Sequence, residues 1–432
     1  MWEWAAKIPA AHSNPTHVQN PIIRLSQAIN CAMTRNAAQR WAAVAVFALA
    51  STWNYLDRSV LSAAGPAVRA EFHLSNEGFG WLVSAFSFAY ALAAPVTGWM
   101  LDRLGLETGI VWAVGLWSLA AAACGWTRSV FQLGLARAVL GAFESTGVSA
   151  AGKLNSIYLE PENRALGAAM TQVGIGIGMV LAPLLVRTLP GWRTPFFVCA
   201  AAGLVWIPIW ILVRRAVPPY QVVPARPRGA VLALPHGRQL VRLAAANILW
   251  MVGYTFWSNW TTLYLAQTYH LTAGQANGWA WIPPAASVLG GFAGGAISRA
   301  AIGRGLPPVQ ARVFAMLVSA VGCLVTLLAP LCPTPLLATT VAAMSYFFTL
   351  AGSVNLYTIP VDIWGGQRAG TAISALVFAY GLLQTVISPL IGRMVDSFGY
   401  GPVCWMVAFP PIVAWLLLRG LPRNRDESGV GV

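Results

Sequence analysis

The chain has 432 residues, of which 57% are hydrophobic and only 9% are charged, and its formal net charge is +14. Soluble globular domains carry about 25% charged residues, so this composition excludes an ordinary soluble protein. The predicted class is an all-α integral membrane protein, because long apolar stretches recur along the whole sequence.

Twelve apolar segments of about 20 residues follow one another, each long enough to cross the hydrocarbon core of a bilayer as a helix. They are predicted at 41–65, 79–101, 109–126, 130–150, 165–187, 194–213, 243–268, 278–298, 312–330, 335–359, 369–391 and 402–419. Residues 1–40 lack the continuous apolar core of a signal peptide, so they are predicted to form an N-terminal cytoplasmic tail. Met33 is a second candidate start of translation within it, and residues 421–432 form the predicted C-terminal tail.

A polar interval at 214–242 divides the segments into two sets of six. We predict an N-terminal six-helix bundle at 41–213 and a C-terminal six-helix bundle at 243–420, joined by this cytoplasmic linker. Three short patterns recur in the same order in both halves: Phe72-His73-Leu74-Ser75 as Tyr269-His270-Leu271-Thr272, Gly80-Trp81 as Gly278-Trp279, and Gly98-x-x-x-Asp102-Arg103 as Gly294-x-x-x-Ser298-Arg299. Such a duplication predicts two pseudo-symmetric bundles that rock about a central cavity.

Positive charge concentrates in the loops on one side of the predicted membrane, including Arg214, Arg215, Arg226 and Arg228 of the linker. Cytoplasmic loops are enriched in Lys and Arg, so both termini are predicted to be cytoplasmic, in the cell (inner) membrane. The excess charge then serves topology and contact with anionic lipid, and does not indicate nucleic-acid binding. The six cysteines form no CxxC pair, and neither a metal site nor a cofactor is predicted.

Four ionisable residues are predicted to lie inside the hydrocarbon, all in the first half: Asp57, Arg58, Arg137 and Glu144. A charged side chain at this depth costs about 2.5–3.5 kcal/mol, so it needs a partner or a function. Arg137 and Glu144 share a helix face, and Asp57 is expected to pair with Arg137 and leave Arg58 facing the cavity. Burial favours the neutral form of a carboxyl group, which suits proton coupling, and arginine can bind a carboxylate ligand bidentately. The alternatives are a static ionic clamp between helices or, for Asp57-Arg58, a helix end at the membrane surface.

Neutral polar side chains in apolar segments are candidates for the wall of the cavity, because a buried hydrogen-bonding group needs a partner. The predicted set is Tyr90, Gln172, Tyr254, Tyr380 and Gln384. For the three in the second half, a hydrogen bond between helices is an equally good explanation. Asp102 and Arg103, after the second segment, are predicted gating residues that cap helix ends or pair across to the other half.

Several groups of residues occur together over residues 50–400: Asn54-Tyr55-x-Asp57-Arg58 with Leu61-Ser62 and Pro66; Gly98-Trp99-x-x-Asp102-Arg103-x-Gly105; Arg137-x-x-x-Gly141-x-x-Glu144; Lys153; Glu162-Asn163-Arg164-Ala165; Ala182-Pro183; and Gly294-Gly295-x-x-Ser298 with Arg304-Gly305 and Ala311-Arg312. In these groups the chain resembles the anion:cation symporter family of the major facilitator superfamily. That family includes bacterial hexuronate and galactonate transporters and the sialin and vesicular glutamate relatives.

The resemblance implies a role for each buried residue. Arg58 would bind the substrate carboxylate, with Tyr90 and Gln172 beside it. Asp57 and Glu144 would carry proton coupling, and Arg137 would modulate them. The chain departs from the family in its eleventh segment, where Phe378 and Leu382 stand in place of asparagines that contact sugar hydroxyls.

The predicted function is therefore that of a proton-coupled symporter that imports an organic anion, foremost a sugar acid such as a hexuronate or hexonate, by alternating access. An organic-anion exchanger and uptake of a non-sugar carboxylate, such as an aromatic or dicarboxylic acid, are the alternatives. A transport-dead sensor or a membrane enzyme is a further class, but the sequence holds no HExxH or GxSxG motif and is not predicted to be an enzyme. Its predicted partners are a small organic anion, protons and lipid, and it is predicted to act as a monomer.

Overall fold

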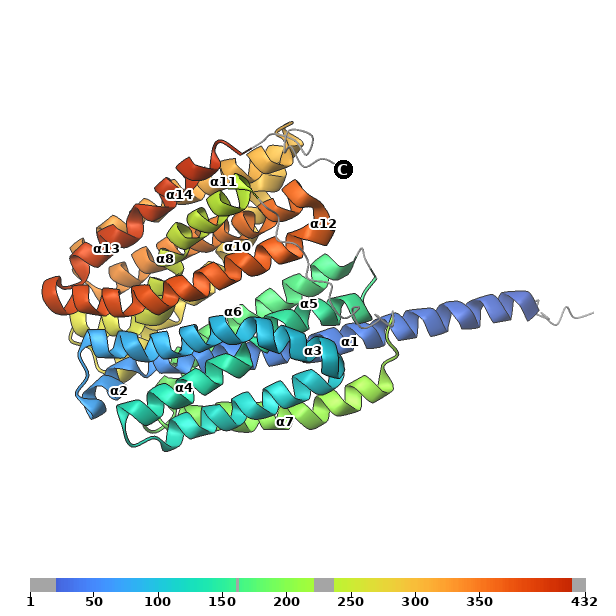
Figure 1. Ribbon diagram of the computed structural model, residues 1–432, viewed down its shortest axis with the longest axis horizontal. Coiled ribbons are helices and arrows are strands. Elements are labelled where there is room, and N and C mark those ends of the chain that lie inside the picture. The colour runs from blue at the N-terminus through green and yellow to red at the C-terminus, as the bar shows by residue number, and fades with distance from the viewer. Residues whose placement is uncertain (1–20, 161–162, 221–236, 422–432) are drawn as a thin grey trace, which may run out of the picture.

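The computed structural model describes residues 21–160, 163–220 and 237–421 (Figure 1). All regular elements of these residues are helices: α1 (Pro21–Ala63), α2 (Gly65–Phe72), α3 (Asn76–Trp126), α4 (Val130–Glu144), α5 (Thr146–Tyr158), α6 (Arg164–Thr188), α7 (Thr194–Ala216), α8 (Arg238–Thr268), α9 (Ala273–Ala280), α10 (Ile282–Gly303), α11 (Pro308–Cys323), the 3-10 helix η2 (Leu324–Leu331), α12 (Pro335–Phe398), α13 (Tyr400–Ala408) and α14 (Pro410–Leu418).

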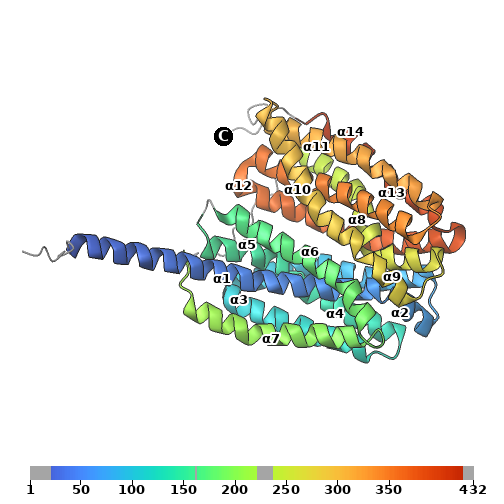
Figure 2. The same ribbon diagram turned by 180° about the vertical axis from the view of Figure 1, so that it is seen from behind.

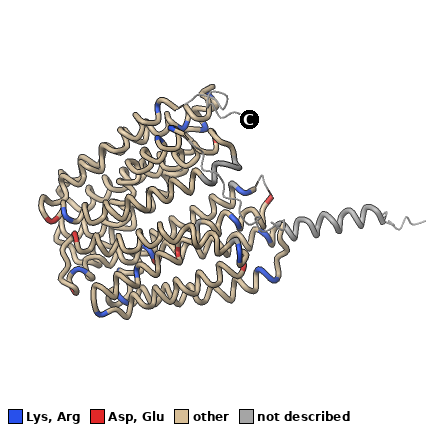
Figure 3. The backbone as a smooth tube through the Cα atoms, viewed as in Figure 1, with Lys and Arg blue, Asp and Glu red and all other residues tan. Residues whose placement is uncertain are grey.

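The helices form two bundles that lie side by side, α1–α7 in one half and α8–α14 in the other (Figures 1 and 2). The bundles are inclined, so that they meet at the end that carries α2 and α9 and separate towards the opposite end, from which α1 projects. The predicted tail is partly helical, because α1 begins at Pro21 and runs without interruption into the first span. Charged residues lie mainly at the two ends of the bundles, with a small group at mid-depth in the N-terminal half (Figure 3).

The twelve predicted crossing segments are all present as helices. Ten stretches of the described chain are long and apolar enough to cross a membrane by themselves. The first predicted segment is less apolar, since α1 carries Asn54, Asp57 and Arg58, and the fourth is divided at Ser145 into α4 and α5. Two long helices each contain a sharp turn at a glycine with positive φ, Gly105 in α3 and Gly365 in α12, and each therefore supplies two crossings.

The sequence repeat is also a repeat of the backbone. His73 and His270 adopt left-handed conformations, with φ of 51° and 52°. After them, the Leu74 amide donates to the Arg69 carbonyl and the Leu271 amide to the Ala266 carbonyl, both at 3.0 Å. Ser75 and Thr272 then cap the following helices through their hydroxyl groups. Two six-helix bundles that share so unusual a turn support the predicted pseudo-symmetry.

A carboxylate of one half caps a helix of the other at the end where the bundles meet. Asp396 on α12 accepts hydrogen bonds from the Asn76 amide (3.0 Å), the Asn76 side chain (2.7 Å) and the Glu77 amide (2.9 Å). A negative charge at a helix N-terminus is favourable, because the first N–H groups have no partner within the helix. Asn76 also accepts from Gln267 of α8, at 3.1 Å. We call this set of contacts the α3–α12 latch.

Two further hydrogen bonds join the halves near this end. The Asn277 side chain of α9 donates to the Ala63 carbonyl of α1 at 2.9 Å. The Ser62 hydroxyl donates to the Asn259 side-chain carbonyl of α8 at 3.3 Å. All four residues belong to segments that meet at the α2 and α9 end, so this end of the interface is sealed.

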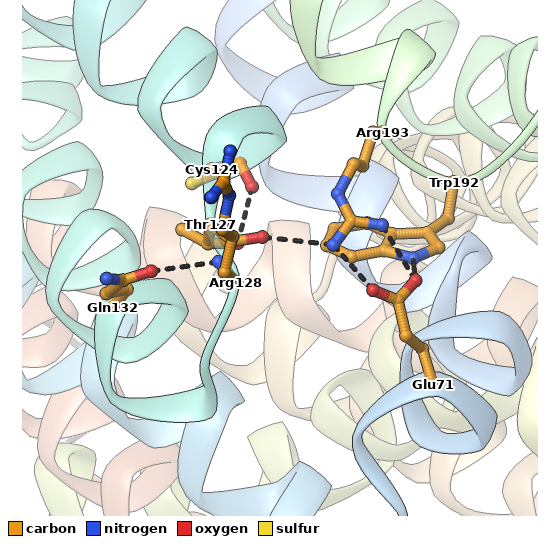
Figure 4. Close-up of polar contacts among 7 residues, drawn as sticks. All are labelled: Glu71, Cys124, Thr127, Arg128, Gln132, Trp192 and Arg193. Atoms are coloured by element: carbon orange, nitrogen blue, oxygen red, sulfur yellow. Dashed lines mark hydrogen bonds and ion pairs between the residues drawn. The ribbon is translucent and has the colours of Figure 1, made fainter.

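Hydrogen bonds of Glu71 on α2 connect the end of α2 to the loop that carries Trp192 and Arg193 (Figure 4). Its carboxylate accepts from both terminal nitrogens of Arg193, at 2.5 and 2.7 Å, and from the Trp192 indole at 2.6 Å. Arg193 also donates to the Thr127 carbonyl, at 3.0 Å, at the end of α3. These charge-assisted hydrogen bonds hold the pKa of Glu71 below its ordinary value of 4.5.

Substitution of Glu71 by glutamine should lower the free energy of unfolding by about 1 kcal/mol, because solvent screens this half-exposed pair. The stabilisation is fully present above the ordinary pKa of glutamate. It disappears as the pH falls through the lower pKa that Glu71 has in the folded protein. Thermal unfolding of the purified wild type and Glu71→Gln at several pH values measures both effects. Glu107→Gln is the control, since Glu107 makes one longer contact, 3.3 Å, with Arg214. Equal unfolding temperatures for Glu71→Gln and the wild type at neutral pH would contradict this role.

Candidate functional site

Three of the four predicted core charges are fully buried in the N-terminal half. Asp57 on α1 is 1% exposed, and Arg137 and Glu144 on α4 are 2% and 1% exposed. Arg137 and Glu144 lie two turns apart on one face of α4, as their spacing of seven predicts. Gly141 stands between them, where a Cβ atom would collide with the Phe86 carbonyl of α3. The glycine therefore lets α4 lie directly on α3 at the depth of the charges.

The expected ion pair between Asp57 and Arg137 does not occur among the described residues. Arg137 instead donates to the main-chain carbonyls of Asp57 and Arg58, both at 3.4 Å. Its guanidinium lies over the Phe86 ring, 4.6 Å from the centroid. Sequence spacing predicts that Arg137 lies near Asp57, but it does not show whether the side-chain carboxylate or the main-chain carbonyl is the partner. In the structure α1 turns its main-chain carbonyls towards Arg137 of α4.

The two buried carboxyl groups keep free acceptor atoms. Both side-chain oxygens of Glu144, and Oδ1 of Asp57, make no hydrogen bond within the described part of the chain. An ionised carboxylate in such surroundings is strongly disfavoured, whereas a protonated one is tolerated. This arrangement suits carboxyl groups that carry their protons.

Arg58, the fourth charge, joins the two halves. It is half-buried, and its guanidinium donates to the Gln384 side-chain oxygen at 2.7 Å and to the Tyr380 hydroxyl at 3.4 Å. Both partners belong to α12, in the opposite bundle. The sequence predicted all three as substrate-binding residues, and the fold brings them into direct contact.

Aromatic rings surround the Arg58 guanidinium. Its central carbon lies 5.7 Å from the centroid of Tyr55, 5.1 Å from that of Phe86 and 5.4 Å from that of Tyr90. Cations are attracted to the faces of such rings within about 6 Å. Tyr254 extends this set in the other half, since its ring packs edge-to-face against Tyr380 with centroids 5.6 Å apart. Tyr90, Tyr254 and Tyr380 therefore belong to one aromatic cluster around Arg58.

The passage between Arg58 and the sealed end is narrow. A cavity of about 30 Å³ lies there, lined from both halves by residues that include Ser59, Ser62, Met179, Trp257 and Pro284. This cavity is far smaller than the pockets of about 300–1,000 Å³ that enclose small-molecule ligands.

Three predicted residues lie apart from this cluster or outside the description. Gln172 of α6 is exposed, and its place beside Arg58 stays a prediction. The Arg103 guanidinium lies over the Trp99 ring, 4.5 Å from its centroid, in an exposed position. The side chain of Asp102 lies outside the described residues, so the gating pair stays a prediction.

Two site residues were missed by reasoning from the sequence, Tyr55 and Phe86. Tyr55 stands within the Asn54-Tyr55-x-Asp57-Arg58 motif but was not assigned a role. Phe86 looks like an ordinary apolar core residue, although it precedes Tyr90 by four residues and so shares its face of α3. That spacing was the available signal.

Residues 47–383 match the profile of the Major Facilitator Superfamily. The chain belongs to this family. It is therefore a membrane transporter and not an enzyme, with twelve transmembrane helices in two pseudo-symmetric bundles.

Proteins similar to this superfamily member include transporters of sugar acids. The hexuronate transporter of Escherichia coli K12 is 24% identical over 89% of this chain and 95% of its own length. The galacturonate transporter of Dickeya chrysanthemi is 24% identical over 59% of this chain and 80% of its own. Among solved structures, a bacterial homologue of the lysosomal transporter Spinster superposes with a TM-score of 0.68 at 20% identity, over 88% of this chain and 95% of that one. This last likeness supports the fold alone.

Proposed function

We propose that this transporter is a proton-coupled symporter that imports an organic anion. The observation that carries the proposal is Arg58, which is held between the halves by Gln384 and Tyr380 and lies next in sequence to the buried Asp57. Arginine presents two parallel donors to a carboxylate, so a substrate carboxylate can replace the two neutral partners. The protonatable groups would be Asp57 and Glu144, with Arg137 beside them.

We further propose that both termini and the linker lie in the cytoplasm, with the protein in the inner membrane. The excess of Lys and Arg in the loops on that side supports this orientation. The sealed end, with α2 and α9, then faces outwards. The described conformation would be the inward-facing state, because the bundles separate towards the linker side (Figure 1).

The transport cycle follows from these contacts. In the outward-facing state Asp57 and Glu144 take up protons and the anion docks on Arg58. The halves then rock, the α3–α12 latch closes behind the substrate, and the anion and protons leave inwards. The contacts of Arg58 with Gln384 and Tyr380 would form again once the substrate has left.

A sugar acid is the first substrate class that we propose, because the relatives transport hexuronate and galacturonate. Aromatic or other weakly hydroxylated carboxylic acids are the second. The rings of Tyr55, Phe86 and Tyr90 around Arg58 favour them.

Uptake into proteoliposomes tests the proposal. Purified protein would be given hexuronates, hexonates, aldarates and aromatic acids, with an inward proton gradient or with none. We expect accumulation of at least one class that depends on the gradient. Uptake that requires a preloaded counter-anion and ignores the gradient would instead identify an exchanger.

The α3–α12 latch should control access from outside. Asp396→Ala removes three hydrogen bonds at the N-terminus of α3, each worth about 1 kcal/mol, so outward opening should increase by about 100-fold. The measurement is labelling of Ser59→Cys, in the small cavity, by a membrane-impermeant maleimide added from outside. Asp362→Ala is the matched control, because Asp362 pairs with Arg312 within its own half at 3.3 Å. Labelling that is equal in the two backgrounds would show that the latch does not hold the outer side closed.

A further inference from the structure

The two arginines of the site share one aromatic ring. Phe86 on α3 is 2% exposed, and the guanidinium carbons of Arg58 and Arg137 lie 5.1 and 4.6 Å from its centroid. Both distances fall within the range of cation–π attraction, which strengthens when water is excluded. A ring that attracts two like charges also offsets part of their repulsion.

The two cations belong to different parts of the transport reaction. Arg58 contacts α12 in the opposite half through Gln384 and Tyr380. Arg137 contacts the main chain of α1 at Asp57 and Arg58 and shares the interior with the free carboxyl oxygens. The Phe86 ring lies against both guanidiniums.

The ring itself is held firmly. It stacks on Tyr90, with centroids 5.9 Å apart and an interplanar angle of 24°. Its main-chain carbonyl lies against Gly141, where no Cβ fits. A fixed ring transmits a displacement of one cation to the other, whereas a mobile ring would absorb it.

We propose that Phe86 is a positioning residue that couples substrate binding at Arg58 to protonation of the carboxyl groups beside Arg137. When a substrate carboxylate draws Arg58 away, the ring face becomes fully available to Arg137 and holds it away from Asp57 and Glu144, which then keep their protons. When either carboxyl group ionises, Arg137 moves towards it, and Arg58 gains the ring and binds substrate less well. The coupling is reciprocal, as linkage requires.

This inference rests on the proposed symport. It gives a role to Phe86, which has none in the proposed transport cycle. The ionisable groups that face Arg137 are Asp57 and Arg58 on α1, Cys124 on α3 and Glu144 on α4, and Cys199 on α7 faces Asp57. The tyrosines that face Arg58 are Tyr55, Tyr90, Tyr254 and Tyr380. A change in pH dependence must therefore be compared with variants that leave all of these groups in place.

Two substitutions at position 86 separate the charge of the ring from its volume. Phe86→Leu removes the ring, and a fluorinated phenylalanine introduced at the same position keeps the ring but weakens its negative face. Phe47→Leu is the matched control, since Phe47 is equally buried but packs on Trp206 and Trp210, away from both arginines. The readout is the affinity for galacturonate, and for benzoate as an aromatic probe, at acidic and at neutral pH.

We expect the affinity of the wild type to fall from acidic to neutral pH. In Phe86→Leu the ratio of the affinities at the two pH values should be about tenfold smaller, which is the effect of losing one well-desolvated cation–π contact. The fluorinated variant should give an intermediate value, and Phe47→Leu should match the wild type. Loss of affinity by the same factor at both pH values in Phe86→Leu, or wild-type behaviour of the fluorinated variant, would overturn the inference and leave symport intact. Wild-type binding with no pH dependence would refute the symport proposal and the coupling role together.

Discussion

Replacing Arg58 with lysine should lower uptake of the transported anion by about 100-fold, since a charge-assisted hydrogen bond contributes about 1.5–3 kcal/mol and lysine cannot make a bidentate pair. Lysine keeps the positive charge, so a large loss would show that the guanidinium geometry is what matters. In the structure a single terminal nitrogen of Arg58 donates to both Gln384 and Tyr380 of the opposite half, so the bidentate pair is expected only with the substrate carboxylate. Initial uptake rates over a range of substrate concentrations measure the effect.

The control for this substitution is Arg128→Lys. Arg128 is exposed in the connection between α3 and α4, where its main-chain amide donates to Gln132 (Figure 4). We expect wild-type uptake from it. An unchanged KM and maximal rate in Arg58→Lys would show that the substrate does not bind this guanidinium.

Asp57→Asn and Glu144→Gln should each abolish uphill uptake while sparing exchange of labelled for unlabelled substrate. Each pH unit of the gradient supplies about 1.4 kcal/mol, or about tenfold accumulation per coupled proton, and an amide at either position cannot carry that proton. Both variants should fold. Glu144 makes no hydrogen bond through either side-chain oxygen among the described residues, so a neutral amide of the same shape replaces a group whose surroundings suit the neutral form.

The two assays are best done on the same proteoliposomes. Accumulation under an inward proton gradient reports coupling, and counterflow without a gradient reports substrate binding and rocking. Retention of gradient-driven accumulation in both variants would remove Asp57 and Glu144 from the coupling mechanism. Loss of counterflow as well would place the affected residue in the substrate site or in the movement of the halves.

Composition and repetition were sufficient to predict the architecture. Apolar length predicts the crossing segments, and the repeated His73 and His270 turns mark the duplication, because a left-handed residue is needed where each helix ends. The position of the core charges was also predictable, because few ionisable residues fall within apolar segments. Since burial of a charge is costly, each of these residues was expected to have a partner or a function.

Contacts between helices were less accessible to sequence reasoning. Arg137 was expected to bind the Asp57 carboxylate but binds the main chain of α1, since the rotation of α1 is set by packing on α6 and α7 and not by its own sequence period. Gln172 was placed beside Arg58 by resemblance alone; its side chain is exposed, and its role stays a prediction. Phe86 was overlooked because an apolar ring has no distinctive pattern until two cations are found beside it.

The α3–α12 latch has a consequence for how this transporter can evolve. Two of the three hydrogen bonds to Asp396 come from main-chain amides, at Asn76 and Glu77. Every amino acid except proline supplies such a donor, so most codon changes on α3 leave that side of the latch intact. Asp396 is a single carboxylate that most replacements destroy. Mutational loss of the hydrogen bonds to Asp396 is therefore concentrated on the Asp396 codon, and substitutions that break this latch should arise there more often than at Glu77.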